Sequence, residues 1–443
     1  MRIDAREAAL KALGKYRRGE SLPDQALEKL TEGMPPRDAA LAAQLLFGVL
    51  QNMALLDYYA SEFSTIRLNK LEPRVLDILR LSIYQIAFLD KIPHNAAVSE
   101  GVSLTAKHSN RRAAGFVNAV LRSAASAAGG GRLPAVDSGS ESRKLSITYS
   151  HPEWFVQELC SSLGPGGAEQ LLSANNAAGI PVTAQVNTLL AGTEEALAML
   201  EYDGADASAH GWLDGCISMR GAGPVARLSA FQKGLIYIQD AAARLAVAAA
   251  APAPGMTVID GCASPGGKSF AAAVAMKNTG SILACDITES KLRRIEEGAR
   301  RLGIGIIKAM NNNALEHASE FDGIADIVFA DVPCSGFGVI RKKPEIRYKS
   351  EQAIASLAEI QKNILLRLSA YVRPGGTLLY STCSVLRREN EAVAEWFLDA
   401  VDSFALDGFE LPHIGGAPGG MCTLWPHIHG TDGFFICKFR RRV

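Results

Sequence analysis

The 443-residue sequence has no net charge, no closely spaced cysteine pair and no long uninterrupted apolar run. Its 46 Lys and Arg are balanced by 46 Asp and Glu, so any RNA-binding site must be a local basic patch. Its eight cysteines contain no C-x-x-C pair, which argues against a structural zinc site and a regular disulfide framework. We find neither the apolar core of a signal peptide nor a run of membrane-spanning length. We therefore expect a cytoplasmic protein with free thiols, no bound metal and no membrane partner.

The chain is too long for one compact core, and its residue patterns divide it into three expected domains. Residues 1–126 carry apolar side chains at helical spacing, which predicts a small all-α bundle. Residues 123–134 have the composition of a flexible linker, and we place the interdomain linker at 127–140. Residues 141–235 mix helical and strand patterns and predict a small α+β domain. Residues 236–443 alternate β-branched runs with helical stretches, which is typical of an α/β doubly wound sheet.

Six strands are expected in and around this sheet. Ligands of open α/β sheets bind beyond the carboxyl ends of the strands, so the segments that follow the strands are the candidate site. One strand is expected in the middle domain, at 182–186, and the final strand of the chain is expected to be antiparallel. The strands expected in the last domain are 256–260, 281–286, 305–310, 324–331, 376–381 and the antiparallel 433–439.

A Gly-rich turn follows the first of these strands and leads into an Ala-rich helix. Glycines let a ligand approach the backbone, and the N-terminus of a helix offers free N–H groups. Asp286 ends the next strand, where an acid typically accepts hydrogen bonds from ribose hydroxyls. A phosphate-binding P-loop is the rival, but Cys262 stands where that motif needs glycine; a tight turn without a ligand is the other alternative. The candidate cofactor-binding residues of the turn are Cys262, Ala263, Ser264, Pro265, Gly266, Gly267 and Lys268.

Two cysteines follow two other strands, and one of them lies close to an acid. Cys334 follows Asp331 in an Asp-Val-Pro-Cys turn, and Cys383 lies in Ser-Thr-Cys-Ser. A thiolate that adds to carbon 6 of cytosine makes carbon 5 nucleophilic enough to take a methyl group. This chemistry needs a cysteine with a depressed pKa and an acid that binds the ring nitrogens, for which Asp331 is placed. The alternative is that both cysteines are structural, as most buried cysteines are.

Three segments resemble the signature motifs of the Sun family of RNA cytosine-5 methyltransferases. They are Asp-Gly-Cys-Ala-Ser-Pro-Gly-Gly-Lys-Ser (260–269), the segment 331–346 that begins Asp-Val-Pro-Cys-Ser-Gly, and the segment 381–391 that begins Ser-Thr-Cys-Ser. The helical N-terminus is similar to the NusB-type RNA-binding bundle of a bacterial branch of this family, for example at 92–98 and 116–122. Together the resemblance spans nearly the whole chain.

The resemblance implies a Rossmann-like class I methyltransferase domain behind an all-α NusB-like bundle, with S-adenosylmethionine as cofactor. It implies that Cys383 is the nucleophile, that Cys334 assists release of the methylated product, and that Asp331 faces the target base. Residues 262–268 match the cofactor loop and Asp286 matches the ribose-binding acid. The bacterial branch acts on small-subunit ribosomal RNA, so ribosomal RNA is the expected partner, with the protein as a monomer.

At two positions the sequence departs from the family pattern. Asn313 stands where the family usually has an aspartate near the adenine of the cofactor; an amide still accepts a hydrogen bond there but lacks the charge. Gln185 stands where an arginine commonly precedes Val186-Asn187, and this removes one expected phosphate contact. These departures bear on cofactor affinity and target choice, and they leave the expected reaction type unchanged.

Basic residues follow both cysteine motifs, and a further basic segment lies at 438–442. They either form a solvated face or clamp RNA phosphates beside a flipped or single-stranded base, and the sequence leaves both readings open. Other functions also remain open: methylation of transfer RNA, a non-catalytic RNA-binding assembly protein with the same fold, or methylation of a protein or small molecule. The basic residues are Arg341, Lys342, Lys343, Arg347, Lys349, Arg387, Arg388, Lys438, Arg440, Arg441 and Arg442.

Overall fold

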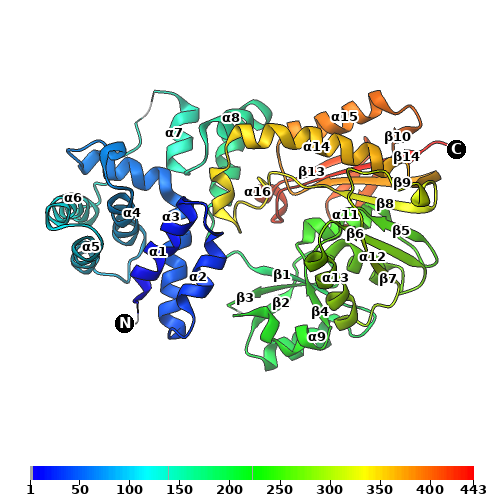
Figure 1. Cartoon of the computed structure of the whole chain (residues 1–443), viewed down its shortest axis with the longest axis horizontal. Helices are drawn as coiled ribbons and strands as arrows, with labels where there is room; N and C mark the ends of the chain where they lie inside the picture. The colour runs from blue at the N-terminus through cyan, green and yellow to red at the C-terminus, as the bar shows by residue number, and fades with distance from the viewer. Residues whose placement is uncertain (1–2, 138, 222) are drawn as a thin grey trace. The chain divides into compact units, whose positions relative to one another are not determined.

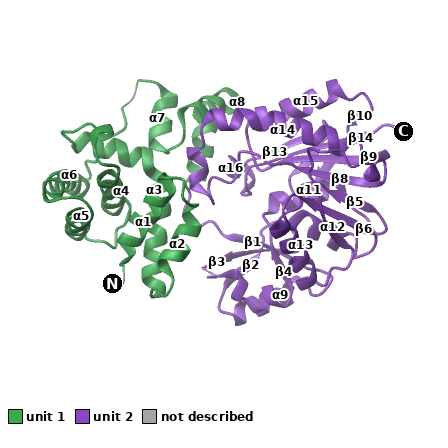
Figure 2. Ribbon diagram, in the orientation of Figure 1, with its two compact units in different colours: residues 1–176 green, residues 177–443 purple. Residues whose placement is uncertain are grey.

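The computed structural model describes residues 3–137, 139–221 and 223–443 and divides the chain into two compact units (Figure 2). Unit 1 covers residues 1–176 and unit 2 covers residues 177–443. The elements of each unit are labelled in Figure 1.

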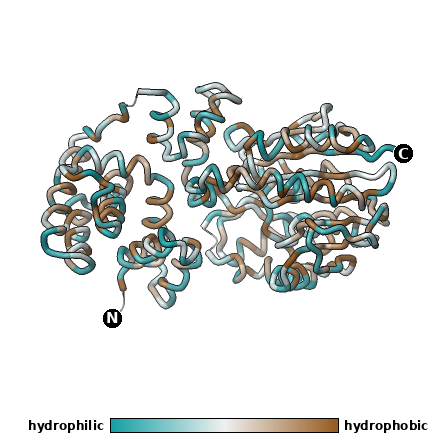
Figure 3. The backbone as a smooth tube through the Cα atoms, turned by 45° about the horizontal axis from the view of Figure 1, so that its top comes forward, coloured by the Kyte–Doolittle hydropathy of each residue, from teal (hydrophilic) through white to brown (hydrophobic). Residues whose placement is uncertain are grey.

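Unit 1 is all-α in the part that the structure describes, as expected for its first 126 residues. Hydrophobic and hydrophilic residues alternate along its helices (Figure 3), which lets each helix bury one face. Capping residues mark several helix starts: Asp4 and Asn110 accept N–H bonds at the N-termini of α1 and α6, and proline opens α2, α3 and α4. The helices are α1 (Ala5–Arg17), α2 (Pro23–Thr31), α3 (Pro36–Phe63), the 3-10 helix η1 (Leu68–Lys70), α4 (Pro73–Phe88), α5 (His94–His108), α6 (Arg111–Gly129), α7 (Glu141–Thr148) and α8 (Glu153–Asn175).

Helix α3 is long and apolar enough, by length and composition, to cross a membrane. Its residues Leu45, Leu46 and Val49 are 0% exposed and belong to the core of the bundle, which is where a central helix of such a bundle carries its apolar side chains. Helix α6 continues to Gly129, so residues 123–129 are helical rather than part of a flexible linker. The reason is their alanine content, because alanine has the highest helix propensity.

Unit 2 begins with a small antiparallel sheet of order β2-β3-β1-β4. The strand expected at 182–186 is confirmed as β1, whose Ala184 and Val186 lie in the core below helix α9. The elements are β1 (Val182–Val186), α9 (Thr193–Tyr202), β2 (Asp206–Ala209), β3 (Cys216–Arg220), η2 (Val225–Arg227), α10 (Ser229–Gln232) and β4 (Ile236–Ile238).

The rest of unit 2 is built on a mostly parallel sheet of order β10-β14-β9-β8-β5-β6-β7, with β13 pairing β14. All six expected strands are present; β14 is antiparallel to β9, as expected, and β9 is longer than expected. The strands are β5 (Thr257–Asp260), β6 (Ser281–Asp286), β7 (Ile307–Asn311), β8 (Ala325–Asp331), β9 (Val372–Thr382), β10 (Phe404–Leu406), β13 (Met421–Leu424) and β14 (Phe434–Arg441), with β11 (Phe409–Leu411) and β12 (Gly415–Ala417) forming a separate pair.

Helices cover both faces of this sheet, so successive strand residues enter different cores. Val258 of β5 belongs to the core shared with α11, α12 and α13, whereas Ile259 belongs to the core shared with α14 and α15. This arrangement is the expected doubly wound fold. The helices are α11 (Ala241–Ala250), α12 (Gly267–Ala275), α13 (Glu289–Arg301), η3 (Ser319–Phe321), η4 (Pro344–Tyr348), α14 (Glu351–Ser369), η5 (Arg387–Glu389), α15 (Glu391–Ala400) and α16 (Pro426–His429).

The strand register brings the expected site residues to one edge of the sheet. Strands β5, β6, β8 and β9 are parallel, and Asp331 at the end of β8 pairs with Ser381 near the end of β9. The carboxyl ends of these strands therefore meet, and the loops that follow them lie side by side.

Candidate active site

The loop between β5 and α12 packs so closely that its glycines leave no room for side chains, which exposes the backbone on its open side. Gly266 has φ +107°, and a Cβ there would lie 2.4 Å from the ring of Phe270. A Cβ at Gly267 would approach the side-chain amide of Gln239 to 3.3 Å. Among the described residues no side chain caps the start of α12, which leaves its first N–H groups for a ligand. The loop thus fits a ligand that packs against backbone, as expected for a cofactor.

Asp286 closes this loop from the end of β6. Its side chain is 7% exposed and accepts the N–H groups of Ser264 at 3.2 Å and Ile287 at 2.8 Å. Lys291 donates to the same carboxylate at 2.9 Å. Asp286 is therefore oriented by the cofactor loop itself. Asn313 is arranged differently, because its amide bonds within its own turn, to the N–H of Leu315 at 3.1 Å and to Glu316 at 2.8 Å.

Asp331 is held at both carboxylate oxygens. Lys268 donates to Oδ2 at 2.5 Å, and the hydroxyl of Ser381 donates to Oδ1 at 2.8 Å. Sequence reasoning assigned Lys268 to the cofactor loop alone; the structure also joins it to Asp331. A third carboxylate lies nearby at the end of β5, where burial raises the pKa of Asp260 to about 6 and Ser269 donates to it at 2.7 Å.

The two cysteines expected to be catalytic lie together. The Sγ atoms of Cys334 and Cys383 are 3.1 Å apart, and both thiols are free, as are those of the other cysteines. The hydrogen bond from Cys334 lowers the pKa of Cys383, while that bond and burial raise the pKa of Cys334 well above its usual value. Cys383 is thus the better nucleophile of the pair, and Cys334 is the thiol that keeps its proton.

A buried polar cluster lies directly behind the thiols, and sequence reasoning did not single out its members. Glu389 is 0% exposed and accepts hydrogen bonds from Ser335, Ser384 and Gln361. Two of these residues directly follow the cysteines. The only available signal was the position of Glu389 six residues after Cys383 within the motif at 381–391.

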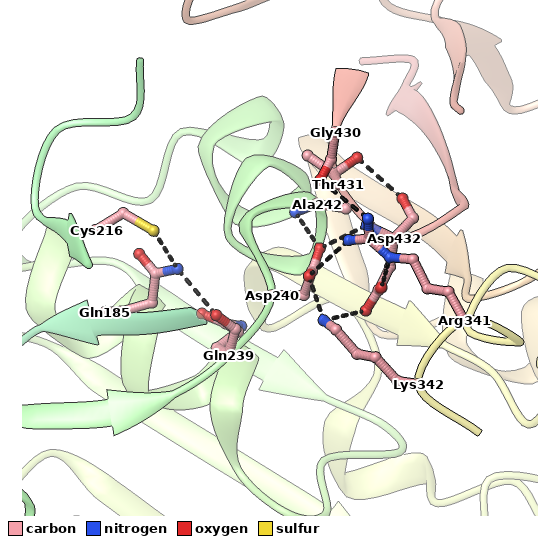
Figure 4. A network of polar contacts seen from close by, with 10 residues as sticks. All are labelled: Gln185, Cys216, Gln239, Asp240, Ala242, Arg341, Lys342, Gly430, Thr431 and Asp432. Atoms are coloured by element: carbon pink, nitrogen blue, oxygen red, sulfur yellow. Dashed lines mark hydrogen bonds and ion pairs between the residues drawn. The ribbon is translucent and has the colours of Figure 1, made fainter. Parts of the chain in front are cut away.

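Three of the basic residues after Asp331 make contacts within the protein. Arg341 and Lys342 form an ion-pair network with the largely buried Asp240 and Asp432, in which the partly exposed Lys342 lies 2.6 Å from Asp240 and 2.8 Å from Asp432 (Figure 4). Arg341 donates to Asp432 at 2.9 Å. Arg347 is 0% exposed, and burial lowers its pKa to about 10. These side chains stabilise the fold of the loop after β8.

Five more of the basic residues form ion pairs or hydrogen bonds with other parts of the protein. Arg387 and Arg388 bind Glu395 and Glu351, at 2.8 and 3.1 Å. Lys349 donates to the carbonyl of Ser335 at 2.6 Å. Lys438 and Arg440 both bind Asp407, at 3.1 and 2.7 Å. These contacts lie largely at the surface, where ion pairs are weak, so the interpretation of the exposed members as a phosphate clamp stays a prediction.

Gln185 is buried in the small sheet, at 0% exposure. Its amide donates to the carbonyl of Gln239 at 3.0 Å and accepts from Arg244 at 2.8 Å (Figure 4 shows the side chain beside Gln239). The side chain of Gln185 therefore connects β1 of the small sheet to Gln239 and to Arg244 of α11. Within the described residues, no group of three or more His, Cys, Asp or Glu side chains could hold a metal ion.

Comparison with known proteins gives family matches over most of the chain. The 16S rRNA methyltransferase RsmB/F family model matches residues 247–440, and the NusB family model matches residues 3–126. The ferredoxin-like domain of RsmF/B-like methyltransferases matches residues 151–226.

Whole proteins match as well. A probable ribosomal RNA small subunit methyltransferase B of Bacillus subtilis is 35% identical over 453 residues, covering 100% of this chain and 99% of the relative. The ribosomal RNA small subunit methyltransferase B of Photorhabdus laumondii is 31% identical over 430 residues, covering 96% and 95%. The crystal structure of PH0851 is 25% identical with a TM-score of 0.82, covering 99% of this chain and 98% of that chain.

These matches confirm the expected fold class: a helical NusB region, a ferredoxin-like middle region and a methyltransferase sheet. They also confirm the expected enzyme class and S-adenosylmethionine as the cofactor. The chain therefore belongs to the RsmB/F family of 16S rRNA methyltransferases.

Proposed function

We propose that this protein methylates carbon 5 of a cytosine in small-subunit (16S) ribosomal RNA through a covalent adduct on Cys383. The observation that carries the proposal is the pair of thiols, 3.1 Å apart, at the ends of two parallel strands beside Asp331. The Bacillus subtilis relative, a probable ribosomal RNA small subunit methyltransferase B, supports the choice of RNA.

Cys383 attacks carbon 6 of the cytosine as a thiolate, which its lowered pKa favours. Asp331, oriented by Lys268 and Ser381, is the acid that hydrogen-bonds N4 and gives a proton to N3 as the thiolate adds, which neutralises the negative charge that the addition places on the ring. S-adenosylmethionine, when bound, supplies the electrophilic methyl carbon for carbon 5. After methylation a base removes the proton from carbon 5 and Cys383 is eliminated, and Cys334, the protonated neighbour, assists release of the product.

The cofactor is held in this proposal by residues 262–268 and Asp286. The close-packed glycines and the uncapped start of α12 accept a ligand against the backbone, and the oriented carboxylate of Asp286 suits ribose hydroxyls. Asn313 would face the adenine from the end of β7, once its amide leaves Glu316. We further propose that the protein acts in the cytoplasm as a monomer, in keeping with its eight free cysteines.

The test is a methylation assay with labelled S-adenosylmethionine and unmodified 16S ribosomal RNA, followed by mapping of 5-methylcytosine. Wild type should label one cytosine, Cys383→Ala should abolish label, and Cys334→Ala should accumulate covalent protein–RNA adducts. Cys422→Ala, a cysteine of β13, is the matched control and should behave as wild type. Transfer to transfer RNA instead would change the proposed substrate. Cofactor binding without transfer to either RNA would favour a non-catalytic RNA-binding protein.

A further inference from the structure

Glu389 is a wholly buried carboxylate that the mechanism above does not use. Its Oε1 accepts the backbone N–H of Ser335 at 2.8 Å and the amide of Gln361 at 3.0 Å. Its Oε2 accepts the hydroxyl of Ser335 and, at 2.6 Å, the hydroxyl of Ser384. Four donors therefore meet at one carboxyl group. An ionised carboxyl can accept all four of these bonds, whereas a protonated carboxyl or an amide carries a donor of its own.

Three of these four donors come from the two loops that carry the thiols, and the fourth comes from Gln361. Ser335 directly follows Cys334, and Ser384 directly follows Cys383. The amide of Gln361 on α14 also donates to the carbonyl of Pro333 at 3.0 Å, so Cys334 is held on both sides. Ser335, Ser384 and Gln361 are each 0% exposed, so water does not compete for these bonds.

Strand pairing alone does not set the distance between the thiols. The last registered pair of β8 and β9 is Asp331 with Ser381, and both cysteines lie beyond it. Beyond that pair, the side chain of Glu389 connects the two loops. It accepts hydrogen bonds from Ser335, which follows Cys334, and from Ser384, which follows Cys383.

We propose that Glu389 is a positioning residue that holds Cys334 and Cys383 within hydrogen-bonding distance of each other. The inference rests on the proposed roles of the two cysteines, and it assigns to Glu389 the task of keeping their thiols in contact. Glu389→Gln keeps the size of the side chain but removes its charge and one acceptor, and the hydroxyls of Ser335 and Ser384 must turn to accept from the new amide. Neutral hydrogen bonds are weaker than charge-assisted ones, so we expect the loops to separate and the hydrogen bond between the thiols to be lost.

The direction in which Glu389→Gln shifts the pKa of Cys383 distinguishes a positioning role from a general loss of stability. The hydrogen bond from Cys334 lowers the pKa of Cys383, whereas the negative charge of Glu389 raises it. If Glu389→Gln separates the thiols, the pKa of Cys383 rises, because the hydrogen bond is the larger influence. If the variant only removes charge and the thiols stay in contact, the pKa of Cys383 falls.

The experiment measures the pH dependence of iodoacetamide alkylation at Cys383, by peptide mass spectrometry, together with methylation kinetics of the full-length protein. We expect Glu389→Gln to raise the pKa of Cys383 and to lower kcat on the order of 100-fold, with KM for RNA changed less than about threefold. Glu389→Asp, which keeps the charge, should restore part of kcat. Glu395→Gln, the same change on exposed α15, is the matched control and should match wild type. Circular dichroism and S-adenosylmethionine binding show that each variant is folded.

A background without Cys334 separates the two influences. In Cys334→Ala the hydrogen bond is already absent, so adding Glu389→Gln should lower the pKa of Cys383. A folded Glu389→Gln protein with normal kcat, or with a lowered pKa of Cys383 in the presence of Cys334, would overturn the inference. Failure of wild type to form an adduct with RNA that contains 5-azacytidine would instead overturn the proposed function, and the alkylation data would still decide the role of Glu389.

Discussion

The ammonium group of Lys268 lies 2.5 Å from Oδ2 of Asp331, which joins the loop after β5 to the end of β8. Ser381 on β9 holds the other oxygen, so three strand ends cooperate to orient one carboxylate. The side chain of Lys268 is 9% exposed and that of Asp331 is 30% exposed, which leaves the carboxylate accessible to a base while its partner is covered.

Loss of the hydroxyl at Ser381 should weaken catalysis more than binding. Ser381→Ala frees Oδ1 of Asp331 to rotate about its remaining bond to Lys268. We expect kcat to fall roughly 10-fold, the equivalent of one hydrogen bond to a charged group, with an unchanged Kd for S-adenosylmethionine. Steady-state kinetics and isothermal titration measure the two quantities. Ser356→Ala, an exposed position on α14, is the control, and an equal loss there would contradict the explanation.

A side chain at Gly338 should disrupt the loop that carries Cys334. A Cβ at this position would lie 1.9 Å from the carbonyl oxygen of Gly433, and the backbone of Gly433 cannot retreat because its N–H donates to Gly338 at 2.8 Å. Gly338→Ala should therefore cost more than about 2 kcal/mol of unfolding free energy. Gly305→Ala, where a Cβ meets nothing within 4 Å, should change it little. Denaturant titration compares the two, and equal midpoints would refute the prediction.

Removal of Lys342 should leave Asp240 and Asp432 with Arg341 as their shared cationic partner, 3.8 Å from Asp240 and 2.9 Å from Asp432. Burial and Asp240 raise the pKa of Asp432, whereas Lys342 keeps the pKa of Asp240 lowered despite burial. Because Arg341 remains and Lys342 is partly exposed, Lys342→Met should destabilise the protein by about 1–2 kcal/mol at pH 7. The loss should shrink as the pH falls, since the carboxylates can then take up protons. It should also change little with salt, because buried charges are weakly screened. The exposed neighbour Lys343→Met is the control for thermal unfolding.

Asp260 should make the protein less stable as the pH rises through 6. Burial raises the pKa of this carboxyl from 3.8 to about 6, so the folded protein binds more protons than the unfolded chain between these values. Stability is then greatest below the unfolded pKa and falls by an amount on the order of 3 kcal/mol by pH 7. Asp260→Asn should remove this dependence. Chemical unfolding from pH 4 to 8 checks it; parallel curves for wild type and variant would contradict the assignment.

The sequence predicted which residues meet at the edge of the sheet. Parallel strands place their carboxyl ends at the same edge, and this does not depend on the conformation of the loops. Asp331, Cys334 and Cys383 follow predicted strands, and the structure brings them together. The bonds among loops were beyond such reasoning. Lys268 and Asp331 are 63 residues apart, and nothing local to either signals the contact.

Charge was the least predictable property. Arg341 and Lys342 follow a strand in a basic run, which is typical of a solvated or RNA-binding surface. Their partners Asp240 and Asp432 lie 102 and 90 residues from Lys342, so only the folded chain reveals that these charges are paired within the protein. Arg347 was misjudged for the same reason, because its burial depends on tertiary packing.

Because Gly433 packs against Gly338, the loop that carries Cys334 depends on a residue that is synthesised much later. Ribosomes deliver residue 433 long after the thiols at 334 and 383, and strand β14 must then insert beside β9. A nascent chain that already carries every reactive group therefore still lacks the support for the Cys334 loop. Methylation competence should therefore begin only when β14 has emerged and paired with β9.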